Sequence, residues 1–138
     1  MTLYVDTSAL LRVVLREPGA LDDLRSCDAM VSSELIAVES ARTIDRLRHQ
    51  GALSTAEAAA RLALVAEWLE AIDLVLLRSA VLTRAAEPLP TPLGTLDAVH
   101  LATALVWRDR MGSPLVVATH DEALALAARA FQFEVIGA

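Results

Sequence analysis

Short apolar segments alternate with longer segments of helical periodicity along the whole chain. Each short segment except the last is followed by a turn or capping residue that predicts the start of a helix. Five of them are predicted to be strands: 3–5, 29–32, 73–77, 115–119 and 134–136. The run 115–119, Leu-Val-Val-Ala-Thr, is apolar enough to be buried on both faces. Strands that alternate with helices predict an α/β fold, with a central parallel sheet of four to five strands and helices on both faces.

Capping and breaking residues place the helices between these strands. Ser33 and Thr95 are expected N-caps, and Ser54 with Glu57 has the pattern of a capping box. The prolines of 88–94 exclude a regular helix there. The expected helices begin after Asp6 and cover 20–25, 33–50, 54–72, 79–86, 96–111 and 121–131. No repeat, low-complexity linker or composition shift divides the chain, so residues 1–138 are expected to form a single domain.

The composition limits the compartment and the chemistry. No apolar run reaches the roughly 18 to 20 residues that span a bilayer, and no basic leader precedes Leu3, so we expect a cytoplasmic protein with no membrane partner. Cys27 is the only cysteine, which excludes an internal disulfide and a cysteine-based metal cluster. The net charge of −6 argues against a protein that holds nucleic acid through a broad basic face. It does not exclude a nuclease whose bound metal supplies the positive charge.

Four acidic residues occupy positions where a parallel sheet binds ligands. Asp6 ends the first predicted strand, and Asp121 follows the most apolar one. Ligands of open parallel sheets bind outside the carboxyl ends of the strands. Glu39 lies about a turn and a half into the helix after the second strand, and Asp97 lies in the first turn after Thr95. Taken singly, each acid also fits an ordinary role as a helix cap, a complement to the helix dipole or a surface group.

Four converging carboxylates would need a cation. Two unit charges 4 Å apart repel by roughly 4 kcal/mol at an effective dielectric near 20, so such a site takes up a proton or a metal ion. Ligands that are all carboxylates favour Mg²⁺ or Mn²⁺ over Zn²⁺. A water activated by that metal could attack a phosphodiester. The acids therefore predict metal-dependent phosphodiester hydrolysis.

Four segments resemble the motifs of the PIN domain, and specifically of the VapC toxins of bacterial toxin–antitoxin pairs. The segments are 5–11 (Val-Asp-Thr-Ser-Ala-Leu-Leu), 33–39 (Ser-Glu-Leu-Ile-Ala-Val-Glu), 95–104 (Thr-Leu-Asp-Ala-Val-His-Leu-Ala-Thr-Ala) and 118–121 (Ala-Thr-His-Asp). They cover nearly the whole chain, in order and at suitable spacing. The resemblance implies a three-layer α/β/α PIN-like fold and a Mg²⁺- or Mn²⁺-dependent endoribonuclease. It also implies a homodimer that a cognate antitoxin holds inactive.

The resemblance assigns roles residue by residue. It makes Asp6, Glu39, Asp97 and Asp121 the catalytic and metal-binding acids, and it makes Ser8 and Thr119 the hydroxyls that support the metal site. It selects Glu39 over Glu34, and helical geometry separates the two, because residues five apart lie about 140° apart around the axis. His120 occupies a position that varies in the family and receives no role.

Other residues keep two interpretations. Arg42 and Arg46 share a helical face with Glu39 and either contact RNA phosphates or pair with nearby acids. His100, three residues after Asp97, either approaches the site or is a buried, hydrogen-bonded histidine. The apolar stripe of Leu62, Val65, Leu69 and Ile72 is either intramolecular core or, as the resemblance suggests, a surface for the antitoxin or the dimer.

Four other functions compete with the toxin. A phosphoryl-transfer protein would normally need a lysine, and all 12 basic residues are arginines. No glycine-rich loop follows the first strand, which disfavours a nucleotide-binding fold. A PIN-type nuclease of RNA processing and a non-catalytic binding module remain alternatives, and Mn²⁺-dependent cleavage separates the module from the enzyme.

Overall fold

Five parallel strands form one sheet in the computed structural model, which describes all of residues 1–138. The strands are β1 (Thr2–Val5), β2 (Ala29–Ser33), β3 (Ile72–Val75), β4 (Val116–Ala118) and β5 (Glu134–Ile136). Their order across the sheet is β3-β2-β1-β4-β5, and every neighbouring pair is parallel. The α/β prediction with a parallel sheet of four to five strands is therefore confirmed.

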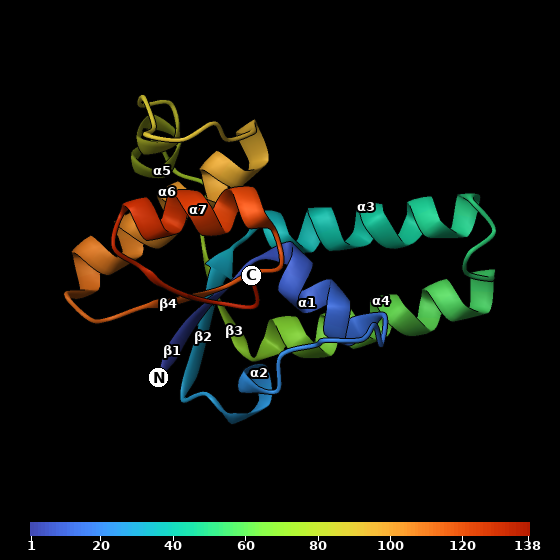
Figure 1. Ribbon diagram of the computed structural model, residues 1–138. Helices are drawn as coiled ribbons and strands as arrows, with labels where there is room; N and C mark the ends of the chain where they lie inside the picture. Colours follow the sequence, from blue (N-terminus) through green and yellow to red (C-terminus); the bar gives the residue numbers. More distant parts are fainter.

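Seven helices cover the two faces of this sheet (Figure 1). They are α1 (Thr7–Val14), α2 (Asp23–Ser26), α3 (Leu35–His49), α4 (Thr55–Glu70), α5 (Ser79–Ala85), α6 (Thr95–Met111) and α7 (Glu122–Ala130). One core cluster joins α1 to α4 with one face of the sheet. A second joins α6 and α7 with the other face. These two cores make the three layers.

Successive side chains of β1 point to opposite faces of the sheet and so contact different helices. Leu3 and Val5 point into the core beneath α1 to α4, and Tyr4 between them points into the core beneath α6 and α7. All three are at most 1% exposed. A strand that is buried on both faces lacks a polar alternation, as expected for the centre of a parallel sheet. Tyr4 is thereby directed toward α6.

Helix α6 is the central helix of its layer. Its residues from Ala98 to Leu105 are buried without interruption, so this stretch has no solvent-facing side. The left-handed backbone of Gly112, with φ of 62°, ends the helix. No helix in the protein is both long enough and apolar enough to cross a membrane.

Several boundaries differ from the sequence prediction. Gly94 is the N-cap of α6, and Thr95 is its first helical residue, so the expected Thr95 cap is wrong. Glu34 is the N-cap of α3 in place of Ser33, although Ser33 Oγ still accepts from Leu35 N at 3.1 Å. Ile72 belongs to β3, because α4 ends at Glu70. The capping box of Ser54 and Glu57 is present as predicted.

The helices α3 and α4 form a hairpin that extends away from the sheet, with α1 packed against its base (Figure 1). Val65 and Ile72 lie in the core beneath it, and Leu69 packs against them. Leu62 is the one member of the apolar stripe that is exposed, at 40%. Of the two interpretations of the stripe, intramolecular core describes most of it, and only Leu62 is exposed enough to contact a partner.

We expect Ile44→Ala to destabilise the protein by about 2–5 kcal/mol, because the change leaves a cavity where Ile44 is completely buried between the hairpin and the sheet layer. Leu62→Ala is the matched control on the same hairpin and should cost under about 1 kcal/mol, since Leu62 is partly solvated. Urea unfolding of both variants measures the difference. Equal losses would contradict the packing described here.

Candidate active site

The candidate site lies where the strand order of the sheet reverses. β1 and β4 are neighbours in the sheet although they are far apart in the chain, and Val5 is paired with Ala118. The pairing continues one residue past β1, because Asp6 N donates to Ala118 O at 3.1 Å. Crevices at such a reversal are the usual ligand sites of open parallel sheets. Asp6 and the segment 119–121 border this one.

Asp6 is a nearly buried carboxylate, with 3% of its surface exposed. Its Oδ1 accepts from Ser8 Oγ at 2.7 Å and from Ala9 N at 3.0 Å, which also caps α1. Its Oδ2 accepts from Thr119 Oγ1 at 2.7 Å. Burial raises the pKa of Asp6 above its ordinary value, and these hydrogen bonds only partly oppose the rise. The ionised form is therefore costly unless positive charge comes close.

Ser8 and Thr119 tie the ends of β1 and β4 together. Besides contacting Asp6, Ser8 Oγ accepts from His120 N at 2.9 Å, and Thr119 Oγ1 accepts from Asp121 N at 3.0 Å. Each hydroxyl thus donates to the Asp6 carboxylate and accepts from the segment after β4. This pair of contacts sets the position of Asp6 relative to Asp121.

Asp121 and Asp97 both lie at the beginning of helices. Asp121 Oδ1 caps α7 by accepting from Leu124 N at 2.8 Å, and no protein donor contacts Oδ2. Asp97 lies in the first turn of α6, and neither of its carboxylate oxygens accepts a hydrogen bond from the protein. Both acids are partly exposed. Their unbonded oxygens remain available to a ligand.

The pKa of Asp97 shows that the acids act on one another. Burial contributes most to raising it to about 6, followed by the charges of Asp121 and Asp6, and the charge of Glu39 adds to the rise. His100 opposes the shift. Like charges within a few ångströms disfavour ionisation in this way. The structure therefore brings the four acids into one electrostatic cluster.

Glu39 reaches this cluster from the second turn of α3. Its side chain is 20% exposed, and its Oε1 accepts from Thr7 Oγ1 at 2.7 Å and lies 2.6 Å from His100 Nε2. Burial alone would raise the pKa of Glu39, but the hydrogen bonds from His100 and Thr7 outweigh it and the net direction is downward. Glu34 has a different task, because its Oε1 accepts from Leu77 N at 2.8 Å in the segment after β3.

The donor set fits a hard divalent cation. All four groups are carboxylates, and Glu39 Oε2, Asp121 Oδ2 and both oxygens of Asp97 are free of protein donors. The side chains do not close on one point, since no three acidic or histidine groups form a ready-made coordination sphere. Mg²⁺ tolerates this arrangement, because it keeps several waters and binds through a few carboxylates. The site suits a divalent cation because carboxylate oxygens are hard ligands and because a cation would reduce the repulsion between them.

The PIN-domain family model matches residues 3–130. The chain belongs to the PIN-domain family. It is 36% identical over 138 aligned residues to Ribonuclease VapC46 of Mycobacterium tuberculosis, and the match covers 97% of this chain and 95% of that protein. The crystal structure of PAE2754 from Pyrobaculum aerophilum superposes with a TM-score of 0.62 and 19% identity, covering 98% of this chain and 83% of that one. At that identity the second likeness shows the fold alone.

The two candidate RNA-binding arginines of this PIN domain, Arg42 and Arg46, make no contact with the four acids, and His120 has no assigned role. Arg42 pairs with Asp45 at 2.6 Å, whereas Arg46 contacts Thr43 Oγ1 and has no carboxylate partner. Both arginines are exposed. His120 Nδ1 lies 3.0 Å from Gly137 O, and its Nε2 is buried without a hydrogen-bond partner.

Tyr4 and Thr7 are buried polar residues whose connection to the PIN-domain acids was missed by reasoning from the sequence. His100, which was expected either to approach the site or to be buried, does both, since its Nε2 lies 2.6 Å from Glu39 Oε1. The signal available for His100 was its spacing of three from Asp97 on one helix. Tyr4 gave no signal, because one aromatic residue in an apolar strand looks like ordinary core. The interpretation of His100 as a buried, hydrogen-bonded histidine agrees with the structure.

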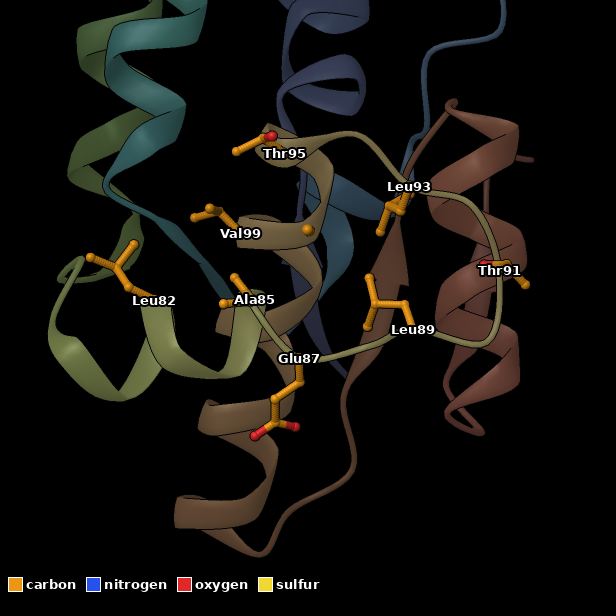
Figure 2. Close-up of a pocket in the computed structure, with 10 residues that line it drawn as sticks. Leu82, Ala85, Glu87, Leu89, Thr91, Leu93, Thr95 and Val99 are labelled. Atoms are coloured by element: carbon orange, nitrogen blue, oxygen red, sulfur yellow. The ribbon is translucent and has the colours of Figure 1, made fainter.

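A separate apolar cavity of about 490 Å³ opens between α5, the proline-rich loop and the beginning of α6 (Figure 2). Leu89, Leu93 and Val99 line it, and the Glu87 carboxylate points away from these aliphatic side chains (Figure 2). None of the four acids lines it. In this PIN domain the acidic cluster lies apart from the apolar cavity, at the edge of the sheet where β1 and β4 end.

Proposed function

We propose that this PIN domain, residues 1–138, is a metal-dependent endoribonuclease that acts as the toxin of a toxin–antitoxin pair. The observation that carries the proposal is the group of four acids at the strand reversal, which are near enough to raise the pKa of Asp97 and which keep oxygens free for a cation. The likeness to Ribonuclease VapC46 over nearly the whole of both chains supports RNA as the substrate.

Asp6, Glu39, Asp97 and Asp121 would hold the metal, which is Mg²⁺ or Mn²⁺. When bound, such an ion activates water for attack on a phosphodiester and stabilises charge on the transferring oxygens. The chain's own residues position the acids: Ser8 and Thr119 fix Asp6, and the Leu124 amide fixes one oxygen of Asp121. Asp97, whose two oxygens accept no hydrogen bond from the protein, is the acid best able to accept a hydrogen bond from a water.

Substrate binding depends on local positive charge, because the chain as a whole is acidic. A bound cation would offset the negative charge of the four carboxylates. Arg46, exposed and without a carboxylate partner, is the better candidate for a phosphate contact, while Arg42 is already paired with Asp45.

We further propose a cognate antitoxin, a homodimer and action in the cytoplasm, where toxin and RNA would meet. The net charge of −6 suits a basic antitoxin segment. The exposed aliphatic side chains of Val38, Leu82 and Leu96, each about half exposed or more, provide apolar area for these contacts in place of the buried stripe.

The test has an enzymatic and a cellular arm. Purified protein should cleave single-stranded RNA with Mn²⁺ or Mg²⁺, stop on addition of EDTA and leave DNA of the same sequence intact. Induced expression without an antitoxin should arrest growth, which colony counts measure. Mn²⁺ binding without cleavage of any RNA would favour the non-catalytic module. Cleavage without growth arrest would favour a PIN nuclease of RNA processing.

A further inference from the structure

A row of buried polar groups runs from the sheet core to the acidic cluster. Tyr4 and His100 are each 1% exposed, and the Tyr4 hydroxyl lies 2.7 Å from His100 Nδ1. Their rings meet edge to face, with centroids 5.9 Å apart and an interplanar angle of 76°. On its other side, His100 Nε2 lies 2.6 Å from Glu39 Oε1. The row connects β1, α6 and α3 at the point where their side chains converge.

The neighbours of Tyr4 determine the direction of these hydrogen bonds. Ser33 N donates to the phenol oxygen at 3.2 Å, so the phenol accepts there. The nearby hydroxyls of Ser32 and Thr103 donate to the carbonyls of Val5 and Val99, each at 2.6 Å. Burial also keeps the phenol protonated, since it raises the pKa of Tyr4 far above its ordinary value. His100 Nδ1, at 2.7 Å, is the acceptor that the hydrogen-bond geometry gives the phenol hydroxyl.

A histidine whose Nδ1 accepts a hydrogen bond carries its proton on Nε2. His100 Nε2–H is then the donor to Glu39 Oε1, in agreement with the short distance between them. Thr7 Oγ1 donates to the same oxygen at 2.7 Å and lies 3.3 Å from His100 Nε2. Two donors thus hold Oε1, while Glu39 Oε2 has none. The half-buried end of Glu39 has one fixed oxygen and one free oxygen.

We propose that Tyr4 and His100 are positioning residues that orient Glu39, so that it offers only its Oε2 to the metal. The inference rests on the proposed function, because it takes Glu39 as a metal ligand. A ligand whose rotamer is already fixed loses less conformational freedom on binding, and groups that hydrogen-bond a ligand commonly contribute 10- to 100-fold in metal affinity. Tyr4 acts through His100, and neither residue needs to touch the metal or the RNA.

The contacts distinguish this arrangement from ordinary core packing. A histidine that only fills the core needs no carboxylate partner. A glutamate that is free at the surface needs no buried hydrogen-bond donor. Here the imidazole has both nitrogens occupied, by a phenol from β1 and a carboxylate from α3. Removal of the imidazole should therefore weaken the affinity of the site for metal, and this loss should depend on the presence of Glu39.

The first experiment uses the wild-type protein alone, labelled with ¹⁵N at histidine. The inference expects a His100 ring that carries a proton on Nε2, the nitrogen that faces Glu39 Oε1. A bare Nε2 would overturn it, because His100 could then not donate to Glu39. This measurement does not depend on any variant folding or on catalysis.

The second experiment measures Mn²⁺ affinity by titration calorimetry in a double-mutant cycle. His100→Leu should weaken binding by about 10- to 100-fold. His100→Gln, whose amide keeps an N–H near the Nε2 position, should recover part of the loss, and Tyr4→Phe should lose less than His100→Leu. In a Glu39→Ala background, His100→Leu should add little, because the group that it positions is gone. His49→Leu, an exposed histidine change on α3, is the matched control and should bind as wild type does.

The outcomes separate this inference from the proposed function. No Mn²⁺ binding and no RNA cleavage by the wild type would remove the proposed function itself. Normal binding by a folded His100→Leu protein would overturn only the positioning role. An equal loss in the presence and absence of Glu39 would also overturn it, since His100 would then act on the fold in general. A His100→Leu protein that fails to fold leaves the glutamine variant and the ¹⁵N spectrum to decide.

Discussion

Asp6→Asn is expected to abolish metal-dependent RNA cleavage, with a loss of more than about 100-fold, while the protein stays folded. The loss exceeds that typical of supporting residues because a ligand itself is removed. Folding should survive, because Ser8 Oγ and Ala9 N still have an oxygen to bond and the buried negative charge is gone. The substitution also removes the negative charge of Asp6, which helps to raise the pKa of Asp97. RNA cleavage with Mn²⁺ and thermal melting in EDTA measure the two effects.

Asp109→Asn is the matched control for this change. Asp109 is exposed on α6, and its substitution should leave both cleavage and melting unchanged. Full activity of a folded Asp6→Asn protein would contradict the assignment of the site. A large fall in the melting temperature in EDTA would show instead that Asp6 is needed mainly for the fold.

Divalent metal is expected to stabilise the folded protein strongly. A ligand that binds only the native state at 100 times its dissociation constant adds about 2.7 kcal/mol. For a chain of 138 residues this corresponds to a rise in melting temperature of about 9 °C. Burial and the neighbouring acids Asp121 and Asp6 raise the pKa of Asp97 to about 6, and a bound cation offsets both effects. Scanning calorimetry with Mn²⁺ and with EDTA measures the rise in melting temperature.

Single substitutions test whether this stabilisation comes from the acidic cluster. Asp97→Asn and Asp121→Asn should each lose most of the Mn²⁺-dependent rise, and Asp109→Asn should keep it. A rise of equal size in all four proteins would place the metal elsewhere and contradict the proposed ligand set.

The strand-end half of the candidate site could be predicted from local sequence. Asp6 directly follows an apolar strand, and Asp121 follows another, so the parallel fold alone brings them to one edge. Their assignment as metal ligands is a separate step and stays a prediction. The placement of Glu39 and Asp97 at the site could be predicted only from the family resemblance. Their positions within helices do not determine whether those helices bring them to that edge of the sheet.

The parts that could not be predicted depend on tertiary contacts. The contact between Tyr4 and His100 joins residues 96 apart in the chain, and only the packing of α6 on β1 brings them together. The apolar stripe that begins at Leu62 kept two interpretations, because a helical pattern cannot distinguish a surface buried against the same chain from one buried against a partner. Thr95 is a good cap by type, but the chain enters α6 one residue earlier, at Gly94.

The placement of β1 between β2 and β4 has a consequence for the order of events on the ribosome. Chains are made from the N-terminus, and the late strand β4 provides both the second neighbour of β1 and the threonine that binds Asp6. Until β4 has been made, the acids of β1, α3 and α6 lack Asp121, and one edge of β1 is open. A nascent chain of this kind is therefore expected to lack the complete acidic cluster until synthesis has passed Asp121.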